Sequence, residues 1–135
     1  MGRTHCLVPA ALAAWLFGPD PTILLISAGT GLLPDIDEPQ STIGYRLFLL
    51  AKGFKGLVGH RTYSHSLVGI VTAASLAVIF DLPWMWIEAG LIGWVSHLVL
   101  DALSGGVPLW WPLYATNRER WVLARWKPFG FADHL

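Results

Sequence analysis

The segment Trp84–Ser104 reads WMWIEAGLIGWVSHLVLDALS and decides the class of fold. It has about the length of a membrane-spanning helix, which needs roughly 20 predominantly apolar residues. His97 and Asp101 stand four residues apart near its end, so on a helix they share one face. Gly90 and Gly93 lie on or near that face, where small residues permit close helix packing. The segment therefore predicts a membrane helix that carries polar groups at one end.

Three further apolar runs flank this segment, at His5–Phe17, Pro21–Leu33 and His65–Leu82. The first two would be only about 20 Å long as helices, so we expect a tilted, membrane-thinning or re-entrant hairpin there. Leu47–Gly59 mixes apolar residues with lysines and predicts an interfacial helix. We predict an all-α integral membrane bundle of about four transmembrane helices plus that interfacial helix. It would form one domain over residues 1–135, with residues 105–135 as a tail on the membrane surface.

The overall composition supports a membrane protein. Of 135 residues, 54% are hydrophobic and 13% are charged, with a formal net charge of zero, against about 25% charged residues in a soluble domain. Without surplus basic charge a nucleic-acid partner is not expected, and the lipid bilayer is the expected partner. The single Cys6 excludes an internal disulfide framework. Six tryptophans fit interfacial belts: Trp84, Trp86, Trp110, Trp111, Trp121 and Trp126.

The basic residues predict the topology. With four spans, all nine Lys and Arg fall in the N-terminus, in residues 34–64 and in the tail, and none in the turns at Gly18–Asp20 and Pro83. The positive-inside rule then places both termini in the cytoplasm. The alternative at the start of the chain is a signal peptide, with Arg3 before an apolar stretch.

Seven His and Asp residues fall at the cytoplasmic helix ends of this topology. They are His5, Asp35, Asp37, His60, His65, His97 and Asp101. Ionisable groups at membrane depth are costly, and so they indicate function. Imidazoles and carboxylates in this combination suit zinc, with manganese and iron as alternatives. Seven groups exceed one tetrahedral site, which predicts two divalent metals, or one metal whose histidines are oriented by outer carboxylates.

Local spacing refines this prediction. Asp35 and Asp37 follow Pro34, and on an extended stretch both carboxylates would point the same way. His60 and His65 would converge if Ser64 caps the following helix. Arg61 would lie nearby and could hold a phosphate or carboxylate.

Each of these features also has a purely structural interpretation. A histidine in an apolar helix can simply be buried, and Asp-x-Asp after proline can be a turn with a helix cap. His60 and His65 could flank a basic surface loop, and His97 with Asp101 could be one hydrogen-bonded pair. Arg61 could serve only the topology.

Four motifs in fixed order carry a family resemblance. They are PDIDEP at Pro34–Pro39, GHRTYSHS at Gly59–Ser66, HLVLD at His97–Asp101 and GVPLWWP at Gly106–Pro112. Together they resemble the YdjM-like family of inner-membrane proteins, described as LexA-regulated with a proposed metal-dependent hydrolase activity. The resemblance implies an inner-membrane protein with a metal site centred on the His and Asp residues of these motifs, and His5 matches an early histidine of the family. A looser likeness, the H-x-x-x-D pair in an all-α fold, links the chain to zinc-dependent phospholipase C enzymes.

The expected function is metal-dependent hydrolysis of a phosphoester or lipid-linked substrate at the cytoplasmic membrane face. His60, His65, His97 and Asp101 would hold the metal. Asp35 and Asp37 would be ligands, or one of them the general base, and Arg61 would bind the anionic part of the substrate. The alternative is a non-catalytic scaffold or partner-binding protein with a structural metal site. A transporter is disfavoured because the polar cluster lies at one face rather than at the midplane.

Overall fold

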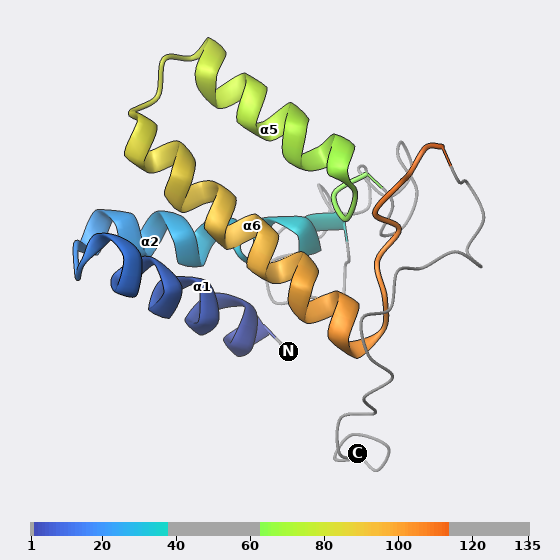
Figure 1. The fold of residues 1–135 in the computed structure, drawn as a ribbon, viewed down its shortest axis with the longest axis horizontal. Coiled ribbons are helices and arrows are strands. Elements are labelled where there is room, and N and C mark those ends of the chain that lie inside the picture. Colours follow the sequence, from blue (N-terminus) through green and yellow to red (C-terminus); the bar gives the residue numbers. More distant parts are fainter. Residues whose placement is uncertain (1, 38–62, 114–135) are drawn as a thin grey trace.

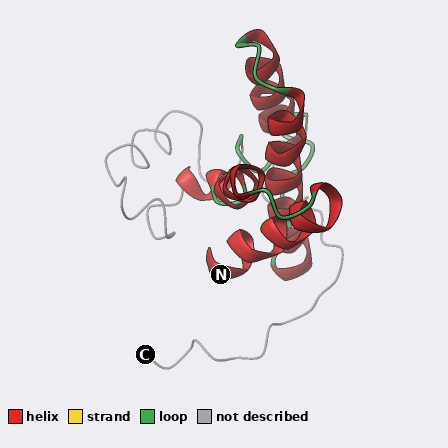
Figure 2. Ribbon diagram, turned by 90° about the vertical axis from the view of Figure 1, so that its left-hand side faces the viewer, coloured by secondary structure: helices red, strands yellow, loops and turns green. Residues whose placement is uncertain are grey.

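The computed structural model describes residues 2–37 and 63–113, and regular structure in these residues is helical (Figures 1 and 2). The elements are α1 Gly2–Phe17, α2 Pro21–Thr30, the short 3₁₀ helix η1 Leu33–Asp37, α5 Leu67–Ile79 and α6 Trp84–Ser104. The prediction of an all-α fold is confirmed for this part of the chain. The predicted interfacial helix at Leu47–Gly59 and the tail beyond residue 113 lie outside the described residues.

The helices form two hairpins whose turns lie at the same side of the molecule. Gly18 has φ +84°, and the Asp20 carboxylate accepts hydrogen bonds from the backbone N–H groups of Thr22 and Ile23 (2.8 and 3.1 Å), which caps α2. Pro21 at the first helical position supports the same start. The second turn connects α5 to α6 and ends at Pro83. Figure 1 shows both turns on the left and the opposite helix ends on the right.

Helix α6 lies at the centre and contacts the other three helices. Its first half packs through Ala89 against Ala13 of α1 and Ile23 of α2. Its second half packs through Leu98 and Ala102 against Val107 and neighbouring apolar side chains. In Figure 1, α5 lies on one side of α6, and α1 and α2 lie on the other.

Small residues hold α1, α2 and α6 together close to the polar helix ends. A Cβ atom on Gly31 would collide with the His5 carbonyl oxygen and the Pro9 ring, and one on Gly93 would collide with Thr30, with Gly31 N and with a carbonyl of α2. The buried Ser27 hydroxyl donates to the Pro9 carbonyl at 3.0 Å. We call these contacts around Gly31 and Gly93 the three-helix junction. Because Gly93 is one turn before His97, the junction fixes where the polar side chains of α6 lie.

One described helix is long enough for a membrane span. Helix α6 has 21 residues and suitable hydropathy, whereas α1, α2 and α5 have 16, 10 and 13 residues, below the roughly 20 that a span requires. The described residues therefore support one candidate span and leave the predicted four-span bundle unconfirmed. Large apolar side chains are nevertheless exposed on all four helices, among them Trp15 (80%), Leu25 (74%), Val71 (62%) and Trp84 (68%). Such a surface is typical of contact with lipid or a partner.

Candidate metal centre

The helix ends opposite the two turns bring five predicted site residues together. His5 lies in α1, Asp35 in η1, His65 just before α5, and His97 and Asp101 in the last turns of α6. All five are buried, with exposed fractions from 0% for His97 to 8% for Asp35. Five ionisable side chains buried in contact with one another are costly unless they serve a shared partner or a network.

Four of them form a group that could hold a metal ion. One ligand atom from each of Asp35, His65, His97 and Asp101 lies within 4.8 Å of the other three. His65 Nε2 and His97 Nε2 are 3.3 Å apart. Asp101 Oδ2 is 3.3 Å from the first nitrogen and 3.5 Å from the second. Asp35 Oδ1 is slightly farther from them, at 3.8 and 3.7 Å. Two histidines and Asp101 therefore form a tight triangle, with Asp35 beside it.

The hydrogen bonds of the two histidines favour metal binding. His97 Nδ1 lies 2.7 Å from the Gly31 carbonyl oxygen. A carbonyl can only accept, so Nδ1 donates, and the neutral ring keeps a lone pair on Nε2. His65 Nδ1 lies 3.0 Å from the Ser64 hydroxyl, which can accept in the same way. Outer hydrogen bonds of this kind orient metal-binding histidines.

The distances match the dimensions of a zinc site. Two ligand nitrogens, each 2.0–2.1 Å from a tetrahedral zinc, are about 3.4 Å apart, and the two Nε2 atoms are separated by 3.3 Å. Two nitrogens with lone pairs directed at each other repel unless a cation or a proton lies between them. The donor set, two imidazoles and two carboxylates, also suits zinc and other divalent metals. These residues thus fit the predicted cofactor, a divalent metal, without identifying which one.

His5 lies beside this group and binds the other oxygen of Asp101. His5 Nε2 is 3.3 Å from Asp101 Oδ1, and its ring lies against that of His97 with centroids 4.2 Å apart. His5 Nδ1 is buried and has no hydrogen-bond partner among the described residues. The sequence predicts His5 as a ligand, and this stays a prediction; in the structure its described polar contact within the group is with Asp101.

Two local predictions are wrong in their backbone geometry. Asp35 and Asp37 lie in the 3₁₀ helix η1 and not on an extended stretch. Helix α5 is capped by Ser66, whose hydroxyl accepts from Gly69 N at 3.3 Å, and not by Ser64. Ser64 instead accepts at its carbonyl from Trp94 Nε1 at 2.9 Å, which ties the His65 turn to α6.

The remaining predicted residues lie outside the described backbone or side chains. His60 and Arg61 lie outside the described residues, and Asp37 has a described backbone but no described side chain. Sequence reasoning did not identify the Gly31 carbonyl, which orients His97, or Trp94. A backbone acceptor gives no signal in residue types, and a tryptophan in an apolar run is expected as packing or as part of an interfacial belt.

Helices with apolar outer surfaces around a buried His and Asp group define a class, a membrane-associated helical protein with a candidate metal centre. The sequence model of the family described as YdjM inner membrane protein matches residues 1–135. The chain therefore belongs to the YdjM inner membrane protein family, which places it at the inner membrane and in association with the lipid bilayer.

Individual relatives agree with this assignment. The chain is 37% identical over 140 residues to the Bacillus subtilis protein YvsG, covering 99% of this chain and 85% of that protein. It is 38% identical over 91 residues to the inner membrane protein YdjM of Escherichia coli and, equally, to that of Shigella flexneri. These matches cover 62% of this chain and 45% of each relative, so the chain aligns with less than half of their length. No solved structure matches the chain significantly.

Proposed function

We propose that this protein is a membrane-bound, metal-dependent hydrolase that acts on a phosphoester or lipid-linked substrate at the cytoplasmic membrane face. The observation that carries the proposal is the buried group of Asp35, His65, His97 and Asp101, whose ligand atoms lie within 4.8 Å of one another. Its position at one end of the helices, in a protein of an inner-membrane family, would let a lipid head group reach it from the membrane surface.

The residues divide into two roles. His65, His97 and Asp101 form the tight triangle and would hold the metal, a set of three protein ligands as in catalytic zinc sites. Asp35 lies 3.7–3.8 Å from both Nε2 atoms and would accept a proton from the attacking water as general base, or complete the ligand set. A bound metal supplies Lewis-acid activation of water and of the ester. Water adds to phosphorus, the ester P–O bond breaks, and the leaving oxygen takes up a proton.

Three further predicted residues, whose side chains the structure does not describe, belong to this proposal. Arg61 would hold the anionic part of the substrate, and His60 and Asp37 would be further ligands, or Asp37 the base. With them the group could take a second metal. We propose that residues 1–135 form one domain with a surface tail from residue 105, with about four spans and both termini in the cytoplasm. Reporter fusions at both termini test this topology, and a periplasmic C-terminus would contradict it.

A specific observation also supports the structural alternative. Four protein groups are enough to close a tetrahedral site, and His65 and His97 are only 1% and 0% exposed. Structural zinc sites are closed by protein ligands, whereas catalytic sites keep one position open. In that case the metal would fix η1, the start of α5 and the end of α6 to one another, and the protein would serve as a scaffold or bind a partner.

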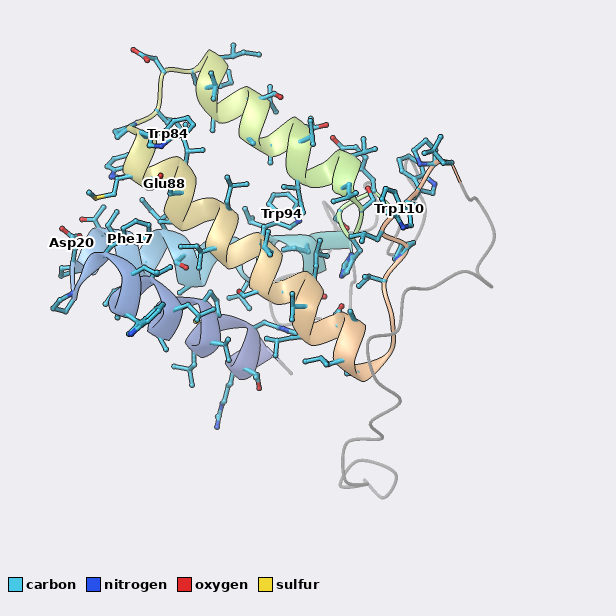
Figure 3. All side chains as sticks on the ribbon, viewed as in Figure 1. Phe17, Asp20, Trp84, Glu88, Trp94 and Trp110 are labelled. Carbon is cyan, nitrogen blue, oxygen red and sulfur yellow. The ribbon has the colours of Figure 1, made fainter. Side chains whose placement is uncertain are left out.

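Metal analysis of the detergent-purified full chain separates these functions. We expect stoichiometric metal in the wild type, its loss in His97→Ala, and retention in the control Glu88→Gln, a half-buried acid near the far end of α6 (Figure 3). Asp35→Ala should reduce phosphoester hydrolysis more than metal content. A wild type without metal would refute both functions. Bound metal without turnover of any phosphoester, together with unfolding when the metal is chelated, would leave the structural function.

A further inference from the structure

A hollow separates the middle of α5 from α6. Its volume is about 270 Å³, close to the lower limit of ordinary ligand pockets, which begin at about 300 Å³. Its walls are almost entirely apolar and come from α2, η1, α5 and α6. We call this space the α5–α6 hollow.

Small side chains create this hollow. Ala73, Ala74 and Ala77 of α5 face it together with Gly90 of α6. Small residues usually let two helices approach closely, but here the space between them remains. A Cβ atom on Gly90 would meet only Thr30 Cγ2 at 3.6 Å, an ordinary contact. Close packing therefore does not require glycine at position 90.

The inner end of the hollow adjoins the candidate metal centre. Leu33 lines it two residues before Asp35, in the same 3₁₀ helix. Trp94 lines it three residues before His97 and donates to the carbonyl of Ser64, the neighbour of His65. Figure 3 shows Trp94 at the middle of α6, on the side of α5. The apolar space thus ends where the buried polar group begins.

The outer end lies at the turn between α5 and α6. Leu82 and Trp86 line the hollow there and are 43% and 42% exposed, and Leu33 at the inner end is 38% exposed. Trp86 and Trp94 are eight positions apart, about 12 Å along a helix. The hollow therefore runs along α6, the candidate span, from an exposed apolar rim to the polar group.

We propose that the α5–α6 hollow binds one hydrocarbon chain of a lipid phosphoester whose polar head lies at the candidate metal centre. The head-group part of this assignment rests on the proposed hydrolase function. An apolar cavity that runs along α6, has partly exposed lining residues and adjoins a buried His and Asp group at its inner end matches an amphiphile, with its chain in the hollow and its ester at the group. The bilayer in which the family resides supplies such molecules at high local concentration, and the exposed rim gives their chains a lateral path of entry.

Photolabelling of the full chain in lipid nanodiscs tests the hollow. The probe is a monoacyl glycerophosphate with a diazirine in the middle of its chain. We expect adducts concentrated on the residues that line the hollow in α5 and α6, and a several-fold loss of labelling in Ala74→Phe, which fills the space. Ser75→Phe is the matched control, because Ser75 is exposed on the same helix and does not line the hollow. It should label like the wild type.

A second variant, together with folding controls, shows whether a loss of labelling comes from misfolding. Gly90→Leu fills the hollow from α6 and should cause the same loss of labelling, while circular dichroism and metal content report whether either variant remains folded. Labelling spread evenly over the exposed surfaces of α1, α2 and α5, or labelling unchanged in folded variants of both kinds, would overturn the proposal.

Hydrolysis assays on the same preparations distinguish the two proposals. Localised labelling without hydrolysis of the lipid probe or of soluble bis(p-nitrophenyl) phosphate would refute the hydrolase and leave the chain-binding site. Hydrolysis combined with unspecific labelling would refute the chain-binding site and leave the hydrolase.

Discussion

Small residues occur on two faces of α6, but the helices pack closely on one face and leave a hollow on the other. On the side of α1 and α2, Gly93 lies so close to α2 that no Cβ atom fits. Gly90 instead lines the α5–α6 hollow together with Ala73, Ala74 and Ala77, and a Cβ atom there would make only an ordinary contact, with Thr30 Cγ2 at 3.6 Å. Small residues thus permit close approach without enforcing it.

Hydrogen bonds account for the closer packing of α1 and α2 than of α5 against α6. At the three-helix junction, Ser27 donates to the Pro9 carbonyl and His97 to the Gly31 carbonyl, so polar contacts hold the helices together. Within residues 2–37 and 63–113, the hydrogen bonds that tie α5 to other elements lie at its site end, where Leu67 N donates to the Leu109 carbonyl at 3.0 Å and Trp94 donates to the Ser64 carbonyl. Apolar helices gain little from contact with each other in lipid, so polar anchors decide where they close up.

Alanine substitutions at the two glycines give the most direct test of the contrast between the two faces of α6. Gly93→Ala should lower the free energy of unfolding by about 1–3 kcal/mol, because overpacking forces α2 and α6 apart, and it should displace His97 and reduce bound metal. Gly90→Ala, the matched control, should be neutral or stabilising by up to about 1 kcal/mol, since alanine is the better helix former. Denaturant unfolding in detergent followed by circular dichroism, with metal analysis, measures both. Equal effects of the two substitutions would refute the contrast between the faces.

A second prediction concerns the polar contacts on the tight side. His5→Phe removes the partner of Asp101 Oδ1 while keeping a ring against His97, and it should weaken metal affinity about 10- to 100-fold, as is typical for residues that orient a ligand. Cys6→Ala is the control, because adjacent helical side chains do not face the same way. Competition with a chelator of known affinity measures the change. Complete loss of metal would instead make His5 a ligand.

The smallest effects are expected at the N-terminal caps of α2, which packs tightly against α6, and of α5, which packs loosely. Ser66→Ala and Asp20→Ala remove the side-chain caps of α5 and α2, and each should cost about 1 kcal/mol of stability. Only Ser66→Ala should also weaken metal binding, because Ser66 follows His65 directly. Thermal unfolding and chelator competition give the two values. A larger metal effect from Asp20→Ala would show that the far turn controls the site.

Helix positions are well predicted by the sequence because apolar runs are interrupted by strong turn residues. Trp84–Ser104 is predicted and observed with the same bounds, and the first two runs end and begin around the Gly18–Asp20 turn as expected. The first hairpin returns its polar helix ends to one side, and the second does the same. The meeting of His5, Asp35, His65, His97 and Asp101 therefore follows from topology and from their places in the sequence.

Details that depend on tertiary contacts could not be predicted. Ser64 and Ser66 are equally good caps by residue type, and Trp94, 30 residues away in the chain, binds the Ser64 carbonyl. The 3₁₀ conformation of Asp35 differs from the expected extended one, and no periodicity is readable in five residues. The division of the Asp101 oxygens between His5 and the two histidines of the triangle requires three helix ends to be placed within a few ångströms.

The Gly31 carbonyl has a consequence for how this site could be altered or transplanted. It selects the protonated nitrogen of His97, and no change of side chain can delete a main-chain acceptor. A search for functional positions by residue chemistry would pass over Gly31, which has no side chain and no charge. Its substitution would nevertheless affect His97, because a shift of the backbone at position 31 moves the carbonyl oxygen that binds Nδ1. A designer who moves the two histidines and two aspartates onto another scaffold must therefore copy this stretch of peptide along with them.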